Sequence, residues 1–262
     1  MSNAPIGIFD SGIGGITIYK EIHALLPNEN IIYLADSKNA PYGGKSKEKI
    51  IEYSVKNTEF LLQHNCKLIV VACNTASTNA VKYLRKHYTV PIIRVQPAIK
   101  PAALHSKTKN VGILATNGTL KSELLLETSQ KFATRVNVVE QVGEGLVSLI
   151  ESGKTNSPEM TVLLNKYIQP MLAKNIDQLV LGCTHYPFLI PQIEKIVGNK
   201  VNILDSGEAI ARQTKVILEQ ENIINTSNSS VELEFYTNDH PIVLQNILNT
   251  FKKNLVVQKI NF

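Results

Sequence analysis

Short apolar runs rich in Val, Ile and Leu recur along the chain, and most are followed by a polar turn and an amphipathic stretch. Such runs are typical of strands buried on both faces of a parallel sheet. We expect strands at residues 5–9, 30–35, 68–72, 91–95, 111–115, 136–141, 179–182, 201–204 and 231–236. We expect helices at residues 16–26, 46–63, 75–86, 158–174 and 207–221, from residue 241 onward, after Thr119 and around Glu151. This alternation predicts an α/β fold.

The pattern repeats in two halves. Residues 97–103 contain two prolines, which mark a change of direction, and the strand–turn–helix units restart at Val111. We expect two similar α/β domains with mostly parallel sheets, related by pseudo-symmetry, with an active site in the cleft between them. The first domain takes residues 1–96 with 208–262, because the tail is expected to return to it, and the second takes residues 97–207.

Composition narrows the class of protein. Of the 262 residues, 44% are hydrophobic and 19% charged, and the net charge is +5. No apolar run approaches a membrane span, and no signal peptide is expected. There is no Trp, and the one cluster of basic residues, at Lys45, Lys47 and Lys49, is typical of a solvated helix start. Neither a nucleic acid nor a membrane is an expected partner.

Three cysteines with no CxxC pair indicate reduced thiols in the cytoplasm rather than disulfides. Cys73 and Cys183 each follow a buried-type strand, at the sheet edge where α/β folds bind ligands. The two thiols could therefore face one another across a substrate, or each could be a small buried residue at a strand end. Cys66 precedes its strand and is expected to be structural. Cys183 and His185 lack the partners of a metal site, so no metal is expected.

Two thiols on opposite faces of an acidic carbon can invert it, since one removes a proton and the other delivers one. Each cysteine precedes an expected helix start, where the helix dipole favours a thiolate. His185 could exchange a proton with Cys183, orient the substrate or only fix a turn. Asp10, beside the glycine-rich turn at residues 12–15, could act similarly near Cys73, and that turn either binds an anion or is a plain tight turn.

Hydrogen-bond donors for a developing carbanion are available from the residues around both cysteines. Tyr42, between Pro41 and Gly43, could present its ring and backbone amides to a ligand, or belong to an ordinary turn. No Lys has a Schiff-base context and no phosphate cup is visible, so the simplest mechanism uses no cofactor. The donor sources are Asn74, Thr75, Thr184, Gly43 and the amides of residues 12–15.

Four motifs, in this order, resemble the glutamate racemases: FDSGIGG at residues 9–15, PYG at 41–43, CNTAS at 73–77 and GCTHYP at 182–187. The resemblance runs through nearly the whole chain. It implies a cytoplasmic, pyridoxal-independent isomerase that interconverts L- and D-glutamate for peptidoglycan synthesis, with Cys73 and Cys183 as the paired acid/base residues. It also implies the two-domain α/β fold.

The resemblance further implies that Asp10 and His185 support the two thiols and that Glu151 is a carboxylate near the site. Asp36 ranks below these residues as a candidate for the site. Residues 97–102 resemble the branch of the family in which a cell-wall precursor acts as activator. The sequence leaves open whether this protein needs such an activator and whether it forms a homodimer. Arg94 and Ala35 stand where the family commonly has Gly, outside the motifs. The substrate contacts implied are Asp10, Ser11, Tyr42, Gly43, Asn74, Thr75, Thr184 and His185.

Three other functions remain open. The first is a racemase of aspartate, or a related decarboxylase or isomerase. The second is a non-catalytic two-domain binder of an acidic amino acid. The third is a thiol-redox protein, which the absence of CxxC spacing disfavours.

Overall fold

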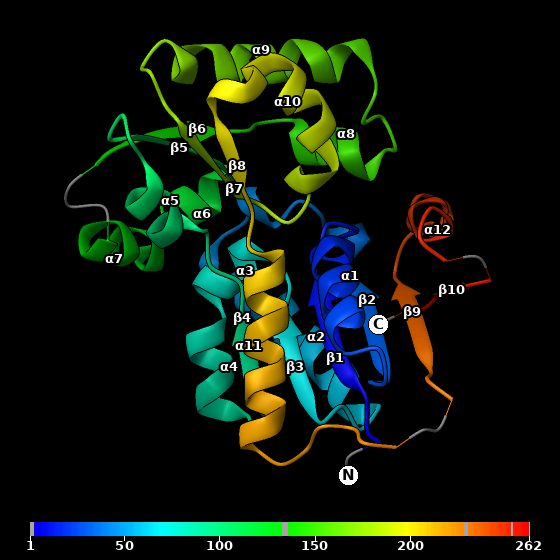
Figure 1. The fold of residues 1–262 in the computed structure, drawn as a ribbon. Coiled ribbons are helices and arrows are strands. Elements are labelled where there is room, and N and C mark those ends of the chain that lie inside the picture. Colours follow the sequence, from blue (N-terminus) through cyan, green and yellow to red (C-terminus); the bar gives the residue numbers. More distant parts are fainter. Residues whose placement is uncertain (1–2, 133–135, 228–229, 253, 262) are drawn as a thin grey trace. The chain divides into compact units, whose positions relative to one another are not determined.

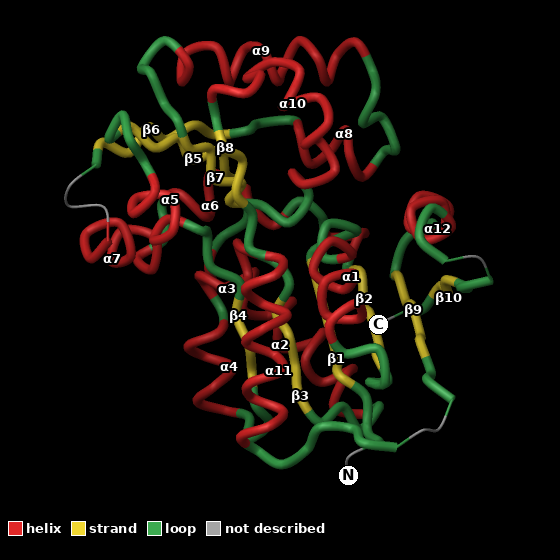
Figure 2. Tube along the Cα trace, in the orientation of Figure 1, coloured by secondary structure: helices red, strands yellow, loops and turns green. Residues whose placement is uncertain are grey.

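A computed structural model describes residues 3–132, 136–227, 230–252 and 254–261 (Figures 1 and 2). The chain divides into two compact units, Met1–Val95 with Gly207–Phe262, and Gln96–Ser206. Each unit is a sheet of parallel strands with helices on its faces, which confirms the predicted α/β class and the mostly parallel sheets. None of the helices in the described ranges is both long and apolar enough to cross a membrane.

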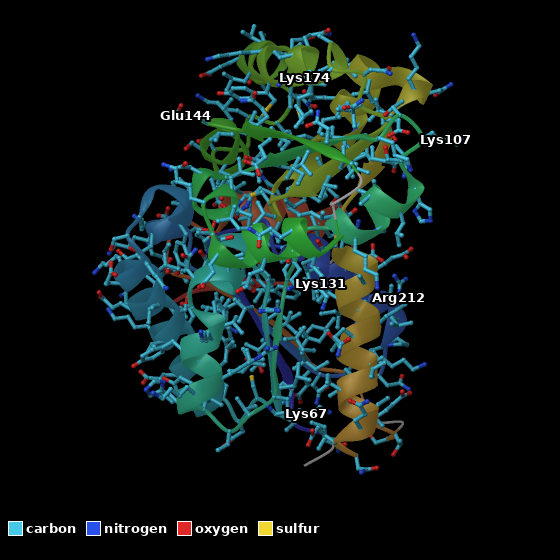
Figure 3. The ribbon with its side chains drawn as sticks, turned by 90° about the vertical axis from the view of Figure 1, so that its left-hand side faces the viewer. Lys67, Lys107, Lys131, Glu144, Lys174 and Arg212 are labelled. Atoms are coloured by element: carbon cyan, nitrogen blue, oxygen red, sulfur yellow. The ribbon has the colours of Figure 1, made fainter. Side chains whose placement is uncertain are left out.

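The first unit has a six-stranded sheet in the order β10-β9-β2-β1-β3-β4, and every pair in it is parallel. Charged side chains lie on the outer surfaces of its helices, as Figure 3 shows for Arg212, which pairs with Glu208 one turn earlier at 2.7 Å. The strands are β1 (Ile6–Asp10), β2 (Ile31–Ala35), β3 (Leu68–Val71), β4 (Ile92–Arg94), β9 (Leu233–Thr237) and β10 (Val257–Lys259). The helices are α1 (Ile16–Leu25), η1 (Ser37–Asn39), η2 (Tyr42–Gly44), α2 (Lys47–Gln63), α3 (Asn74–Asn79), α4 (Val81–His87), α11 (Gly207–Gln220) and α12 (Ile242–Asn249).

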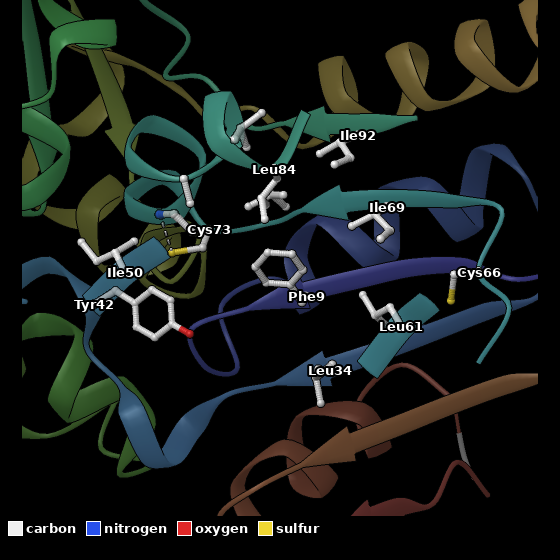
Figure 4. Packing of buried hydrophobic residues seen from close by; sticks show 14 of the residues in the cluster. Phe9, Leu34, Tyr42, Ile50, Leu61, Cys66, Ile69, Cys73, Leu84 and Ile92 are labelled. Carbon is white, nitrogen blue, oxygen red and sulfur yellow. Dashed lines mark hydrogen bonds between the residues drawn. The ribbon is translucent and has the colours of Figure 1, made fainter. Parts of the chain in front are cut away.

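Both faces of the central strands β1, β2 and β3 are buried, as their apolar runs predict. Phe9, Leu34 and Val71 are neighbours across three strands and pack into one cluster with side chains of α2, α3 and α4 (Figure 4). On the other face, Phe235 of β9 meets Tyr19 of α1 edge to face, with ring centroids 5.1 Å apart. Because successive strand residues point to opposite faces, a continuous apolar run is what such a strand requires.

The second unit has a four-stranded parallel sheet in the order β6-β5-β7-β8. On one face, Val111 and Ile113 of β5 form a buried cluster with side chains of α5, α6 and α7. On the other, Gly112 leaves room for Met171 of α9, since a Cβ there would lie 2.7 Å from the Met171 Cε. The strands are β5 (Asn110–Ala115), β6 (Asn137–Val142), β7 (Gln178–Gly182) and β8 (Asn202–Leu204). The helices are α5 (Ile99–His105), α6 (Asn117–Leu120), α7 (Glu123–Phe132), α8 (Leu146–Glu151), α9 (Pro158–Leu172), η3 (Tyr186–Leu189), α10 (Ile190–Val197) and η4 (Gly198–Lys200).

The two sheets share one strand order. In the first unit β1 lies between β2 and β3, with β4 beyond, and in the second unit β5 lies between β6 and β7, with β8 beyond. Cys73 follows β3 and Cys183 follows β7, so each cysteine leaves the third strand of its unit at the carboxyl edge. The two cysteines therefore occupy equivalent positions in the two topologies.

Several elements differ from the sequence predictions. The segment expected only to change direction at residues 97–103 contains α5, and α10 and β10 were not predicted. The single helix expected at residues 75–86 is interrupted at Ala80. Its cause is local, because Thr78 and Asn79 both donate side-chain hydrogen bonds to the Thr75 carbonyl and so compete with the helical pattern.

Candidate active site

Cys73 joins β3 to α3 in the first unit. It is the N-cap of α3, and its sulfur accepts a hydrogen bond from the Ala76 N–H at 3.5 Å. Its thiol donates to the hydroxyl of Ser11 at 3.4 Å. The predicted helix start after Cys73 is therefore confirmed, and the sulfur lies against a backbone N–H that favours negative charge on it.

Asp10 ends β1 and organises the glycine-rich turn. Its Oδ1 accepts from the Ser11 N–H at 2.6 Å and the Ser11 hydroxyl at 3.2 Å, and its Oδ2 accepts from the Gly15 N–H at 2.5 Å. Gly15 is required sterically, because a Cβ there would lie 2.8 Å from the Cβ of Asp10. Ser11 thus links the buried Asp10 carboxylate to the Cys73 thiol.

Asn74 and Thr75 open α3 directly after the cysteine, and both are buried. Nδ2 of Asn74 is buried and has no hydrogen-bond partner among the described residues. A buried donor without a partner is costly, so an acceptor at this position would be stabilising.

Tyr42 lies in η2 and is buried in the same cluster as Cys73 (Figure 4). Its hydroxyl donates to the carboxylate of Asp36 and accepts from Asn57 Nδ2 at 3.1 Å. Burial and the charge of Asp36 raise the pKa of Tyr42 well above its usual value, so the hydroxyl keeps its proton. The ring that the sequence suggested for a ligand thus packs inside the protein, with Gly43 next in the chain.

Asp36, ranked low in the sequence analysis, lies at the centre of this network. Besides Tyr42, its carboxylate accepts from Asn39 Nδ2 at 2.8 Å and from Asn238 Nδ2 at 2.5 Å. Burial raises the pKa of Asp36, and the hydrogen bonds from Tyr42, Asn238 and Asn39 act against that rise. Asp36 is therefore held by two side chains of its own loop and by one from the segment that follows β9.

Cys183 leaves β7 in the second unit and is followed by the buried Thr184 and His185. Its surroundings differ from those of Cys73, because the helix start expected after Cys183 is that of the short 3-10 helix η3 at Tyr186, three residues beyond, and the sulfur does not cap it. Instead, Nδ1 of His185 lies 3.8 Å from the Cys183 sulfur. The two thiols are thus equivalent in topology and different in their partners.

His185 connects Cys183 to Glu151, the last residue of α8. Nε2 of His185 lies 2.5 Å from Oε1 of Glu151. Burial disfavours the imidazolium, but hydrogen bonds to Cys183 and Glu151 and the charges of both groups outweigh it, and the pKa of His185 is raised well above its ordinary value. A positive imidazolium stabilises negative charge on the neighbouring sulfur.

Two tyrosines hold the turn before α8: Tyr186, which enters the sequence analysis only as part of the GCTHYP motif, and Tyr167, which is absent from it. The hydroxyl of Tyr186 donates to the carbonyl of Gly143 at 3.1 Å, and that of Tyr167 donates to the carbonyl of Glu144 at 2.8 Å. This turn leads into the helix that ends at Glu151. The tyrosines therefore fix the backbone that carries the partner of His185.

Comparison with known proteins identifies the family. The family model described as Asp/Glu/Hydantoin racemase matches residues 6–214. The chain belongs to this family. A curated glutamate racemase of Herpetosiphon aurantiacus is 44% identical over 241 residues, which cover 92% of this chain and 95% of that protein. The resemblance stated from the four motifs is thereby confirmed.

Solved structures of glutamate racemases have the same fold as this chain. A glutamate racemase isoform from Bacillus anthracis superposes with a TM-score of 0.88 at 30% identity, covering 100% of this chain and 99% of that one. The glutamate racemase of Escherichia coli, solved in complex with L-glutamate and the activator UDP-MurNAc-Ala, gives 0.86 at 32% identity and covers 98% of each chain. The two-unit α/β architecture is thus that of solved glutamate racemases.

The structure of this family member groups the predicted residues into two sets, one in each unit. Asp10, Ser11, Asn74, Thr75, Tyr42 and Gly43 belong to the unit of Cys73, and Thr184, His185 and Glu151 to the unit of Cys183. The sequence did contain a signal that Asp36 belongs to the site, because it directly follows β2 at a strand end. In the structure its N–H donates to the Asp10 carbonyl at 3.0 Å. By the same strand-end rule, Asn238 after β9 could have been noticed.

Proposed function

We propose that this protein is a glutamate racemase in which Cys73 and Cys183 exchange protons with opposite faces of the substrate α-carbon. The observation that carries the proposal is the equivalent placement of the two thiols, each after the third strand of its sheet and each hydrogen-bonded to a polar partner. The names of the relatives, and L-glutamate in the Escherichia coli complex, support glutamate as the substrate.

The proposed reaction consists of two proton transfers. The thiolate of one cysteine takes the α-proton, the C–H electron pair stays on carbon, and the thiol of the other cysteine gives its proton to the opposite face. The substrate is inverted, and the enzyme is left with the protonation states of its two sulfurs exchanged. The proposal requires both sulfurs to reach the α-carbon of one glutamate, and it uses no cofactor and no metal.

In the first unit, Ser11 is the proposed relay between Cys73 and Asp10. When the sulfur is a thiol, it donates to Ser11, and when it is a thiolate, the Ser11 hydroxyl can turn and donate to it. Asp10 accepts from that hydroxyl and fixes the glycine-rich turn. We assign the unpartnered amide of Asn74 to a substrate carboxylate, because a carboxylate supplies the acceptor that this buried donor lacks.

In the second unit, His185 is the proposed partner of Cys183. Its imidazolium stabilises the thiolate before proton abstraction, and Glu151 holds the ring in place through Nε2. The other proposed substrate contacts are the side chains of Thr75 and Thr184 and the backbone at Tyr42 and Gly43. In this scheme Asp10 and Glu151 act through Ser11 and His185 rather than on the substrate directly.

The decisive experiment is to follow the circular dichroism of L-glutamate and, separately, L-aspartate with dialysed enzyme and no added cofactor. We expect loss of the L-glutamate signal and little change for L-aspartate. α-Deuterium incorporation in heavy water is measured in parallel. Faster loss of the aspartate signal would assign a different substrate. Thermal stabilisation by glutamate without exchange would indicate a binding protein, and a reversible disulfide on mild oxidation would indicate a redox protein.

We extend the proposal to the cellular role, in which the D-glutamate product supplies peptidoglycan synthesis in the cytoplasm. Two regulatory properties are tested with the same assay. The first is activation, measured as the change in kcat/KM when UDP-MurNAc-Ala, the activator in the Escherichia coli complex, is added. The second is a homodimer, measured by light scattering across the enzyme concentrations used in the assay.

A further inference from the structure

Asn238 ties the C-terminal segment to the loop after β2. It follows β9 directly and is buried. Its Oδ1 accepts from the Lys38 N–H at 3.0 Å, and its Nδ2 donates to Asp36 Oδ1 at 2.5 Å. Both ends of one amide side chain are therefore used by a loop that lies some two hundred positions earlier in the sequence.

Asp36 carries this connection to Tyr42. One carboxylate oxygen accepts from Asn238 and Asn39, and the other accepts from the Tyr42 hydroxyl. Asn57 of α2 donates to that hydroxyl at 3.1 Å. The 3-10 turns η1 and η2 make up most of this loop, and such short turns have little stability of their own. The loop is thus held by side chains from outside it.

The same loop lies beside the Cys73 thiol. Tyr42 and Cys73 belong to one buried cluster, as Figure 4 shows, and η2 contacts α3, the helix that Cys73 caps. A displacement of η2 would therefore change the backbone next to the proposed reacting sulfur. All of these groups belong to one unit of the chain.

We propose that Asn238 is a positioning residue for the substrate, acting through Asp36 and Tyr42 on the backbone of the loop at residues 36–44. This inference rests on the proposed function, in which Tyr42 and Gly43 contact glutamate. Asn238 lies outside residues 6–214, the part that matches the family model. The C-terminal segment is thereby a component of the binding site as well as of the sheet.

The test compares Asn238→Asp with the exchanged pair Asp36→Asn/Asn238→Asp. The single variant places two carboxylates against each other and removes the donor to Asp36. The exchanged pair restores one donor and one acceptor with their positions reversed. We expect the KM for glutamate to rise about tenfold or more in Asn238→Asp, with a smaller change in kcat, and most of the loss to be recovered in the pair. Asn246→Ala, at an exposed position on α12, is the matched control and should leave both constants unchanged.

Amide hydrogen exchange without substrate gives a second readout. In Asn238→Asp and in the milder Asn238→Ser, exchange is expected to quicken in peptides covering residues 36–44 and to stay unchanged in α9. The inference is overturned if folded variants show unchanged KM and unchanged loop exchange. Faster exchange in all peptides with a lowered Tm, or no recovery in the exchanged pair, would also overturn it by assigning Asn238 a general structural role. An inactive wild-type enzyme would instead refute the proposed function, while the exchange data would still decide whether Asn238 holds the loop.

Discussion

Nε2 of His185 lies 2.5 Å from Oε1 of Glu151, inside the second unit. The raised pKa of His185 means that the folded state binds this proton more tightly than the unfolded state. The resulting stabilisation is complete below the ordinary histidine pKa, 6.5, and is lost as the pH rises through the raised value. The ion pair therefore stabilises the protein most at mildly acidic pH.

Substituting Glu151→Gln tests this relationship. The neutral amide no longer stabilises the imidazolium, so we expect the free energy of unfolding to fall by about 1–3 kcal/mol near pH 6. The difference from wild type should narrow as the pH rises through the raised pKa of His185, because the wild-type histidine then also loses its proton. Urea unfolding at several pH values measures it. Glu144→Gln, at an exposed carboxylate before α8, is the control. A difference that stays constant or widens with pH would contradict the assignment.

Removal of either proposed acid/base cysteine is the most direct test of the mechanism. Cys73→Ala and Cys183→Ala should each lower racemisation by about a hundredfold to ten-thousandfold or more, because each removes the proton carrier for one face. Residual α-deuterium exchange should be confined to one enantiomer, and to opposite enantiomers in the two variants. Circular dichroism and mass spectrometry measure the two quantities.

Cys66→Ala is the matched control for these variants. Burial raises the pKa of Cys66 to about 12, and this thiol precedes β3 at the sheet edge opposite Cys73. We expect its racemase activity to stay near that of wild type. Full two-way activity in Cys73→Ala or Cys183→Ala would refute the two-thiol scheme.

The parts of the fold that follow from local pattern were predictable. β1, β2, β3, β5 and β7 are short apolar runs bounded by turn residues, and both cysteines could be placed at strand ends from these runs alone. β10 and α10 were missed for a physical reason. β10 is three residues long with two exposed side chains, so pairing with β9 defines it more than its own sequence. α10 has Pro191 in its first turn, where proline is well tolerated, although proline breaks a helix at interior positions.

Only those site residues that lie at strand ends or within short motifs could be predicted from the sequence. Ser11, His185 and Asn74 lie within three residues of a strand end or a cysteine, so the sequence placed them. The contacts of Asp36 with Asn238, and of Tyr186 with Gly143, join segments that are distant along the chain. Such contacts depend on strand order, β9 beside β2 and β6 beside β5, and no local pattern encodes that order.

Gly143 and Tyr186 form a close contact that can be tested by paired substitutions. A Cβ at residue 143 would collide with the Tyr186 hydroxyl oxygen, so Gly143→Ala should displace the turn before α8. We expect about 1–3 kcal/mol of destabilisation and reduced racemisation, because that helix ends at Glu151. Adding Tyr186→Phe removes the oxygen and should recover part of both losses. Thermal unfolding and the racemisation assay measure the four variants of this cycle, and strictly additive effects would contradict the contact.

Glu29 and Lys67 form a buried ion pair at the amino edge of the first sheet, with side chains 2% and 4% exposed and the charged atoms 2.6 Å apart; Figure 3 labels Lys67. Glu29 also accepts from the Asn225 N–H at 2.7 Å. Lys67→Met should lower the free energy of unfolding by about 3–5 kcal/mol, because it leaves a buried carboxylate without its counter-charge. Glu29→Gln added to it should recover part of that loss.

Substitutions in the Glu29–Lys67 pair should change stability without changing catalysis. Lys67 precedes β3 and Cys73 follows it, so the two residues lie at opposite ends of this strand. We expect kcat and KM of the folded Lys67→Met enzyme to stay near wild type, while urea unfolding shows the loss. Lys49→Met is the control, since the Lys49–Glu52 pair is about half exposed, with side chains 45% and 47% accessible, and an exposed pair contributes about 0–1 kcal/mol. Equal destabilisation by the two substitutions would show that burial does not set the strength of the Glu29–Lys67 pair, and the argument from an uncompensated buried charge would then fail.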